Sequence, residues 1–212
     1  MRKYLPFLYV LFILTTSISC ISDQQASYDD EEINIHQQKV EAFRKQKDAD
    51  YKIPEKTMLP ADLMKDFEGL RYYPIDYKYK VDAKLSRLED LPPIKIKTST
   101  GKVADYVIYG KLSFVIDDLP VELSVYQSAR LVGTERVKNA LFMPFTDETS
   151  GEETFGGGRY LVMDIPEGDI LTIDFNLAYN PYCVYDSTHS CPIPPKENEL
   201  EVKIEAGELI YP

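Results

Sequence analysis

The sequence predicts a mainly β protein: an antiparallel β-sandwich or open barrel with one or two N-terminal helices. Three observations support this fold class. From residue 77 onward, apolar and polar residues alternate in short runs, which is the period of a half-buried strand. Turn residues separate these runs at regular spacing, as in sandwiches and barrels. Helical spacing of apolar residues occurs only before that point, so a doubly wound α/β sheet is not expected.

The length and composition indicate one acidic, folded domain with a sizeable core. The chain has 212 residues, of which 44% are hydrophobic, and its 9 Phe and 16 Tyr argue against global disorder. It carries 24 Lys+Arg against 35 Asp+Glu, a formal net charge of −11. A nucleic-acid partner is not expected, because phosphate binding needs clustered lysine and arginine. We expect residues 28–212 to form this single globular domain.

The N-terminus predicts export. Arg2 and Lys3 precede an apolar run over residues 5–14, and small and polar residues follow it. This order is typical of a secretory signal peptide. The run is too short for a membrane span, which needs about 20 apolar residues.

The end of this segment predicts a lipid anchor. Its small residues before Cys20 resemble a bacterial lipobox, although Ser17 stands where leucine is commonest. We expect residues 1–19 to be a lipoprotein signal peptide, Cys20 to be lipidated and residues 20–27 to form a tether. The protein would then be anchored to the bacterial outer membrane, facing the periplasm or the cell surface. An ordinary signal peptide with a chance cysteine is the alternative.

The first helix is predicted over residues 27–50. Asp29 can cap it, acidic residues fill its first turn, and basic residues follow toward its end. Its apolar stripe is thin and includes Val40 and Phe43, so we expect the helix to lie across the domain surface. His36 shares that side and is expected to be half-buried or solvated rather than a ligand. A shorter second helix is predicted over residues 59–69.

The strands are predicted from their alternation and from the turns between them. The most distinct pattern is a hairpin whose turn is predicted at Asp117-Asp118-Leu119-Pro120. A second hairpin is predicted around residues 166–169. The expected strands are residues 77–84, 94–97, 106–116, 121–126, 159–165, 170–176 and 200–204.

Cys183 and Cys191 are predicted to form a disulfide, because an even pair of cysteines in an oxidising compartment usually pairs. The alternative is a pair of free thiols with a redox or metal-binding role. Metal sites usually recruit further cysteines or histidines, but only His189 lies between these two, and no C-x-x-C spacing is present.

Two segments are unusually rich in special residues, and together they resemble a known family. Residues 144–160 read P-F-T-D-E-T-S-G-E-E-T-F-G-G-G-R-Y, and residues 174–183 read D-F-N-L-A-Y-N-P-Y-C. With C-P-I-P-P-K-E-N over residues 191–198, they resemble domain-of-unknown-function family 1684, over roughly residues 30–210. The resemblance implies no activity, since the family has none established. It agrees with a lipoprotein of the Bacteroidetes type.

The glycine run before Arg159 allows two interpretations. Its backbone N–H groups and the guanidinium could hold a carboxylate or phosphate, with Gly157 in the cradle. Alternatively, the run is a tight entry into a strand, and Arg159 pairs with an acid such as Glu153 or Asp174. The P-loop spacing is absent, so nucleotide chemistry is not supported.

The polar loops allow similar alternatives. The acidic residues around Asp147 and Glu153 could offer oxygens to Ca²⁺, but solvated acidic loops are common, and we expect no metal and no cofactor. Asn176, Asn180 and Tyr182 could contact a ligand such as a sugar, or they could hydrogen-bond the backbone of irregular loops.

The sequence supports three functional hypotheses. The first is a lipid-anchored envelope domain that binds a small anionic molecule, a glycan or a protein partner without turnover. The second is a hydrolase in which Asp147, Glu153 or Asp174 acts on an envelope or dietary polymer. The third is a subunit that docks to an envelope protein through residues 27–50. The candidate ligand-binding residues are Asp147, Glu153, Gly157, Arg159, Tyr160, Asp174, Asn176, Asn180 and Tyr182.

Overall fold

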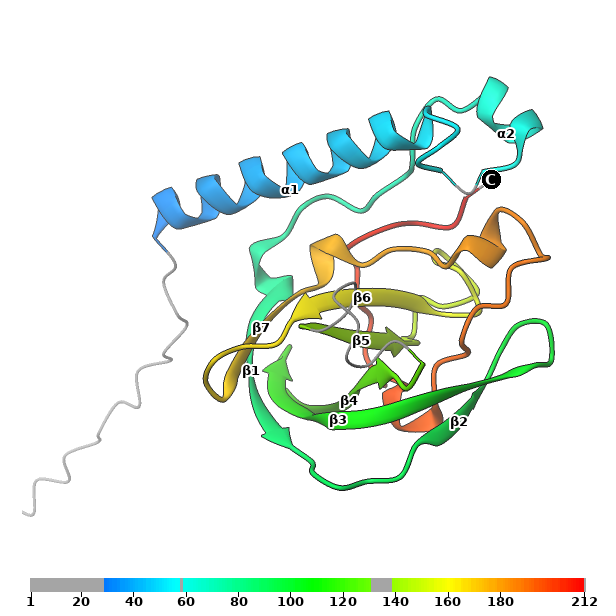
Figure 1. Cartoon of the computed structure of the whole chain (residues 1–212). Coiled ribbons are helices and arrows are strands. Elements are labelled where there is room, and N and C mark those ends of the chain that lie inside the picture. Colours follow the sequence, from blue (N-terminus) through cyan, green and yellow to red (C-terminus); the bar gives the residue numbers. More distant parts are fainter. Residues whose placement is uncertain (1–28, 58, 131–138, 212) are drawn as a thin grey trace, which may run out of the picture.

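The protein is an antiparallel sheet nearly closed into a barrel, with one main helix lying along its outside (Figure 1). This confirms the predicted fold class. The computed structural model describes residues 29–57, 59–130 and 139–211. The predicted signal peptide and Cys20 therefore lie outside the described residues.

The helices are α1 (Asp30–Tyr51) and α2 (Ala61–Lys65), and the strands are β1 (Lys80–Arg87), β2 (Ile94–Lys97), β3 (Val103–Ile116), β4 (Leu119–Ser128), β5 (Ala140–Phe145), β6 (Arg159–Asp164) and β7 (Ile170–Asp174).

The strand order explains why the sheet curves. It runs β6-β5-β4-β3-β1-β7, with β2 paired to one end of β3. The first and last strands of this order, β6 and β7, are consecutive in the sequence. The chain therefore crosses from one edge of the sheet to the other through a short turn, which requires the two edges to lie near each other.

The predicted β3–β4 hairpin is confirmed, although its turn is shorter than predicted, because β4 begins at Leu119. Ile116 and Leu119 are paired across the turn, and Asp117 and Asp118 have positive φ angles of 47° and 62°. Positive φ at both central residues is the geometry of the tight turns that suit the twist of a hairpin. Gly110 marks an irregularity in β3, where a Cβ atom would lie 2.7 Å from the carbonyl oxygen of Ser86.

The second predicted hairpin is wrong. The turn around residues 166–169 exists, but β6 pairs with β5 and β7 pairs with β1. A turn signal in the sequence shows where the chain reverses, whereas the hydrogen-bond partner of each strand depends on how the whole sheet curls. Strand β5 was not predicted, because its apolar run does not alternate.

The predicted last strand, residues 200–204, is an extended segment outside the named strands. It still alternates, with Leu200, Val202 and Ile204 buried in the core. Its backbone bonds to the loop after β5: Leu200 N–H donates to Thr146 O at 2.8 Å. The predicted hydrophobic alternation is therefore confirmed, but the segment bonds to a loop instead of a strand ladder.

Side chains fill the inside of the barrel. Strand β1 and strands β3 to β7 contribute to one core cluster, and 3₁₀ turns and the C-terminal segment complete it. A ligand site is therefore expected on the outside of the barrel. The largest apolar side chains of this cluster include Tyr79, Phe114, Leu112, Leu123, Leu141, Met143, Phe145, Ile173, Phe175 and Ile204.

Helix α1 has 22 residues and begins close to its prediction. Asp29 caps it by accepting a hydrogen bond from Glu31 N–H at 3.1 Å. Figure 1 shows the helix running along one side of the barrel, above β7 and the C-terminal segment. Val40 and Tyr51 are its buried apolar residues, so its other buried contacts are polar. Helix α2 has five residues and is shorter than predicted.

Candidate functional site

Arg159 and Asp147 form a buried ion pair inside the protein. Both side chains are 0% exposed, and Arg159 Nη2 lies 3.1 Å from Asp147 Oδ1. The guanidinium also donates to the backbone carbonyls of Ile204 and Ala206. Burial lowers the pKa of Arg159, and the charge of Asp147 opposes that shift. The predicted anion role is not supported, because this guanidinium is enclosed. The alternative, in which Arg159 pairs with an acid, is supported, although the acid is Asp147 instead of Glu153 or Asp174.

The glycine run before Arg159 shapes a turn. Gly158 has a φ of +85°, and a Cβ atom there would lie 2.5 Å from the carbonyl oxygen of Phe145. Both features require glycine. Gly157 has no positive φ, and a Cβ atom there would meet the ring of Phe155. The run is therefore the tight entry into β6 that the sequence allowed as an alternative.

Asp174 and Asn176 form a second, partly buried network. Asp174 accepts hydrogen bonds from the backbone and side-chain nitrogens of Asn176 at 3.1 and 2.9 Å. Asn176 then bonds both backbone groups of Asp76. The remaining Asp174 oxygen lies 2.7 Å from His36 Nε2. His36 is only 6% exposed, so the expectation of a half-buried or solvated histidine is wrong.

Asn180 belongs to a third network, around Glu208. The Glu208 carboxylate is 1% exposed, accepts from Asn180 N–H at 2.8 Å, and lies 2.5 Å from Lys47 Nζ. The same ammonium lies 4.6 Å from the ring centroid of Tyr179. The asparagines of the motif therefore satisfy backbone and buried charge, which was the alternative to ligand contact.

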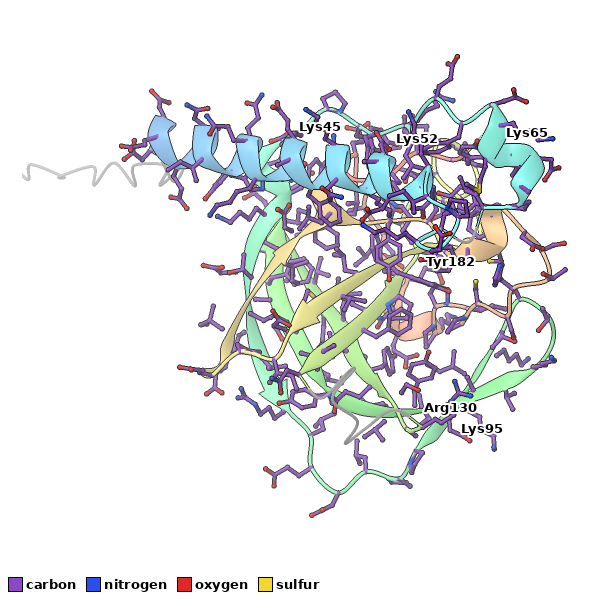
Figure 2. The ribbon with its side chains drawn as sticks, turned by 45° about the horizontal axis from the view of Figure 1, so that its top comes forward. Lys45, Lys52, Lys65, Lys95, Arg130 and Tyr182 are labelled. Carbon is purple, nitrogen blue, oxygen red and sulfur yellow. The ribbon has the colours of Figure 1, made fainter. Side chains whose placement is uncertain are left out.

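The remaining predicted residues have partners of their own. Glu153 accepts from Tyr73 Oη at 2.9 Å, and Tyr160 Oη donates to Pro192 O at 2.5 Å. Tyr182 is 40% exposed (Figure 2).

The three carboxylates of the hydrolase hypothesis have separate surroundings. Asp147 pairs with Arg159, Glu153 with Tyr73 and Asp174 with His36. Asp147 borders a shallow cleft beside Glu199 and Glu201, whereas Asp174 borders a different one beneath α1. A general acid and a general base must flank one bond, so this arrangement does not support the hydrolase. Within the described ranges, no group of three or more His, Cys, Asp or Glu residues could hold a metal ion.

Cys183 and Cys191 are neighbours and are present as free thiols in this structure. The backbone N–H of Cys183 lies 3.3 Å from Cys191 Sγ. Burial is the main cause that raises the pKa of Cys191 to about 12. Because the thiolate is the reactive form, this thiol is a poor nucleophile at neutral pH.

The structure reveals a cleft between α1 and the barrel that combines apolar walls with charged groups. Its volume is about 360 Å³, within the range typical of sites for small organic molecules. The helix lines it with residues spaced three or four apart, which places them on one face. The lining residues are Glu32, Ile35, His36, Lys39, Val40 and Phe43 from α1, with Lys80, Thr172, Asp174 and Leu177 from the barrel.

Most charges in this cleft are already paired. His36 meets Asp174, and Lys80 Nζ lies 3.4 Å from Glu32 and 3.0 Å from Tyr77 Oη. Hydrogen bonds from Tyr77 and Lys80 lower the pKa of Glu32. Burial tends to lower the pKa of Lys80, but its bonds to Tyr77 and Glu32 outweigh that effect and raise it. Lys39 is exposed and has no ion-pair partner among the described residues.

The chemistry of the cleft suits binding better than nucleophilic catalysis. Its described lining contains no serine or cysteine, and the Thr172 hydroxyl donates to Asp82 at 2.6 Å. His36 holds a fixed orientation between Asp174 and the edge of the Tyr77 ring. Among the sequence candidates, only Asp174 lines this cleft. The thin apolar stripe of the predicted helix was the one signal in the sequence that pointed to it.

Comparison with known proteins places the chain in an uncharacterised group. A family model described as "Protein of unknown function (DUF1684)" matches residues 65–209. The solution NMR structure of an uncharacterised protein from Haloarcula marismortui is similar, with 34% sequence identity and a TM-score of 0.66. That similarity covers 85% of this chain and 97% of the other. No curated protein matches. In the part of the chain that the structure describes, no helix has the length and apolar character needed to cross a membrane.

Proposed function

Because the chain belongs to the DUF1684 family, which is described only as being of unknown function, we propose a function from its cleft. We propose that the protein is an exported, lipid-anchored domain that binds a small organic molecule between α1 and the barrel without chemically changing it. Cys20 would carry the lipid, and the acidic barrel would stand away from the membrane on a short tether.

One observation carries the binding proposal. Ile35 and Phe43 are 45% and 43% exposed, and both lie on the wall of a cleft that also contains the His36–Asp174 pair. Apolar side chains beside a few oriented polar groups are the usual composition of a small-molecule site. The paired charges would orient a ligand, while the apolar wall would supply most of the binding free energy.

We test the binding proposal by asking which small molecules purify with the protein. The full chain is expressed in its processed form, and bound compounds are extracted and identified by mass spectrometry. The variant I35E/F43E places two carboxylates in the apolar wall at exposed positions, so it should fold and lose the bound compound. Leu91→Glu is the matched control, because Leu91 is 42% exposed and lies outside this cleft.

The wild-type protein and the L91E control should carry the same compound, and I35E/F43E should carry much less of it. Equal amounts in all three proteins, or none in any, would overturn the cleft as the binding site. Conversion of the compound into a new product during incubation would contradict binding without turnover.

Export and anchoring form a separate part of the proposal and need a separate measurement. Lipid should be attached to the wild-type chain and absent from Cys20→Ala, as read from the mass of the mature protein. In an oxidising compartment Cys183 and Cys191 should form a disulfide, so neither should react with a thiol reagent until a reductant is added. A wild-type chain of unprocessed mass would contradict this part.

A further inference from the structure

We propose that the molecule bound in the α1 cleft is an amphipathic anion: an apolar chain or ring system with one negatively charged group held by Lys39. This inference rests on the proposed function, because it assigns a ligand class to the same site.

The exposed apolar side chains that α1 contributes to the cleft, Ile35 and Phe43, lie on either side of Lys39. Ile35, Lys39 and Phe43 are spaced four residues apart and lie on one face of the helix, over about 12 Å of its length. The buried Val40 and the partly buried Leu177 also line the cleft. Large apolar side chains clustered beside a concave surface usually mark an interaction site, whereas isolated ones do not. This wall therefore requires a ligand with an extended apolar part.

The pairing of the charged groups favours an anionic ligand. Glu32 lies 3.4 Å from Lys80 Nζ, and the Asp174 oxygens are already bonded to His36 and Asn176. Lys39 is then the charged side chain of the cleft that keeps no partner among the described residues. A protein with a net charge of −11 repels anions in general. An unpaired ammonium in a cleft therefore creates a local preference for an anionic group.

Other ligand classes fit the same cleft less well. A cationic molecule would need a free carboxylate, but both carboxylates of the cleft are already bonded. A glycan would need many free donors and acceptors, whereas the polar groups here bond mainly to each other. An apolar body with one anionic group leaves these bonds intact and uses Lys39.

The experiment compares three amphiphiles with similar apolar tails by calorimetric titration of the mature chain, each below its micelle concentration. Dodecanoate carries a negative head, dodecyltrimethylammonium a positive head and dodecyl maltoside an uncharged sugar. We expect dodecanoate to bind most tightly. Lys39→Gln should weaken dodecanoate binding about two- to fivefold, as for an exposed ion pair, and leave the maltoside unchanged.

Lys45→Gln is the matched control for charge, because Lys45 is an exposed lysine of the same helix outside the cleft (Figure 2). It should leave all three affinities unchanged. Equal binding of the cationic or sugar-headed amphiphile would overturn the anion proposal, and so would equal effects of K39Q and K45Q. The absence of dodecanoate binding would overturn it as well.

Phe43→Ser separates failure of this inference from failure of the proposed function. If F43S weakens every amphiphile that binds, and Leu91→Ser does not, the cleft is the site even when the preference for a negative head fails. If amphiphiles bind and F43S has no effect, both the ligand class and the site are wrong. If none binds, the co-purification experiment alone decides the proposed function.

Discussion

At the scale of single residues, the family motif builds structure around buried charges. Arg159 is enclosed with Asp147, and three backbone groups of the C-terminal segment bond to the pair: the carbonyls of Ile204 and Ala206 and the N–H of Ile204. The Nε of Arg159 has no hydrogen-bond partner among the described residues. An ion pair taken out of water loses hydration, so it is tolerated only when its hydrogen bonds are made. The motif residues Asp147 and Arg159 therefore hold the end of the chain against the barrel.

This network predicts a large effect of removing either charge. Asp147→Asn leaves a buried guanidinium without its counter-ion, and we expect it to lower the free energy of unfolding by about 3–5 kcal/mol. Arg159→Met should have a similar effect. The double variant D147N/R159M should lose less than the sum of the two, because it leaves no unpaired charge. Urea denaturation measures these values, and a loss below about 1 kcal/mol for D147N would contradict the burial argument.

At the scale of elements, α1 is attached to the barrel mainly through polar contacts. Lys47 reaches the buried Glu208, His36 reaches Asp174, and Arg44 donates to the carbonyl oxygens of Tyr73 and Asn176. The family model begins at residue 65, so α1 lies outside the matched region. Even so, the helix supplies the partners of two acidic residues within that region. Helix α1 is therefore an integral part of this fold.

The attachment of α1 can be tested with two lysines of the same helix. Lys47→Met removes the ammonium from Glu208, which is 1% exposed, and should lower the free energy of unfolding by about 3–5 kcal/mol. Lys45→Met changes an exposed side chain and should shift it by less than about 0.5 kcal/mol. Chemical denaturation followed by circular dichroism compares the two. Equal values for both variants would show that the Lys47–Glu208 pair does not hold the helix.

At the scale of the whole molecule, the fold surrounds many tyrosine hydroxyls with protein. Desolvation by burial raises the pKa of each of these phenols in the folded state, whereas an exposed tyrosine ionises near pH 10. Carboxylates add to the effect, and Glu208 raises the pKa of several of them. The affected residues are Tyr51, Tyr72, Tyr160, Tyr179 and Tyr185.

These shifts predict that stability is lost at alkaline pH. The folded protein keeps its phenols protonated, while the unfolded chain releases those protons near pH 10. The stabilising contribution is therefore fully present below about pH 10 and declines above it. Urea unfolding at pH 8, 9.5 and 10.5 should show this decline, and the phenolate absorbance of these tyrosines should appear only as the protein unfolds. Their ionisation near pH 10 in a still-folded protein would contradict the prediction.

The sequence by itself determined the fold class, the position of α1 and the β3–β4 hairpin. These features depend on residue periodicity, on a capping aspartate and on turn residues, all of which act over a few neighbouring positions. Only the tertiary structure decided which strands pair, which acid meets Arg159 and where a ligand could bind. His36 and Asp174 are 138 residues apart in sequence, and Lys47 and Glu208 are 161 apart. Such pairs form because the barrel closes and brings α1 and the C-terminal segment to the same side, and no local pattern encodes that contact.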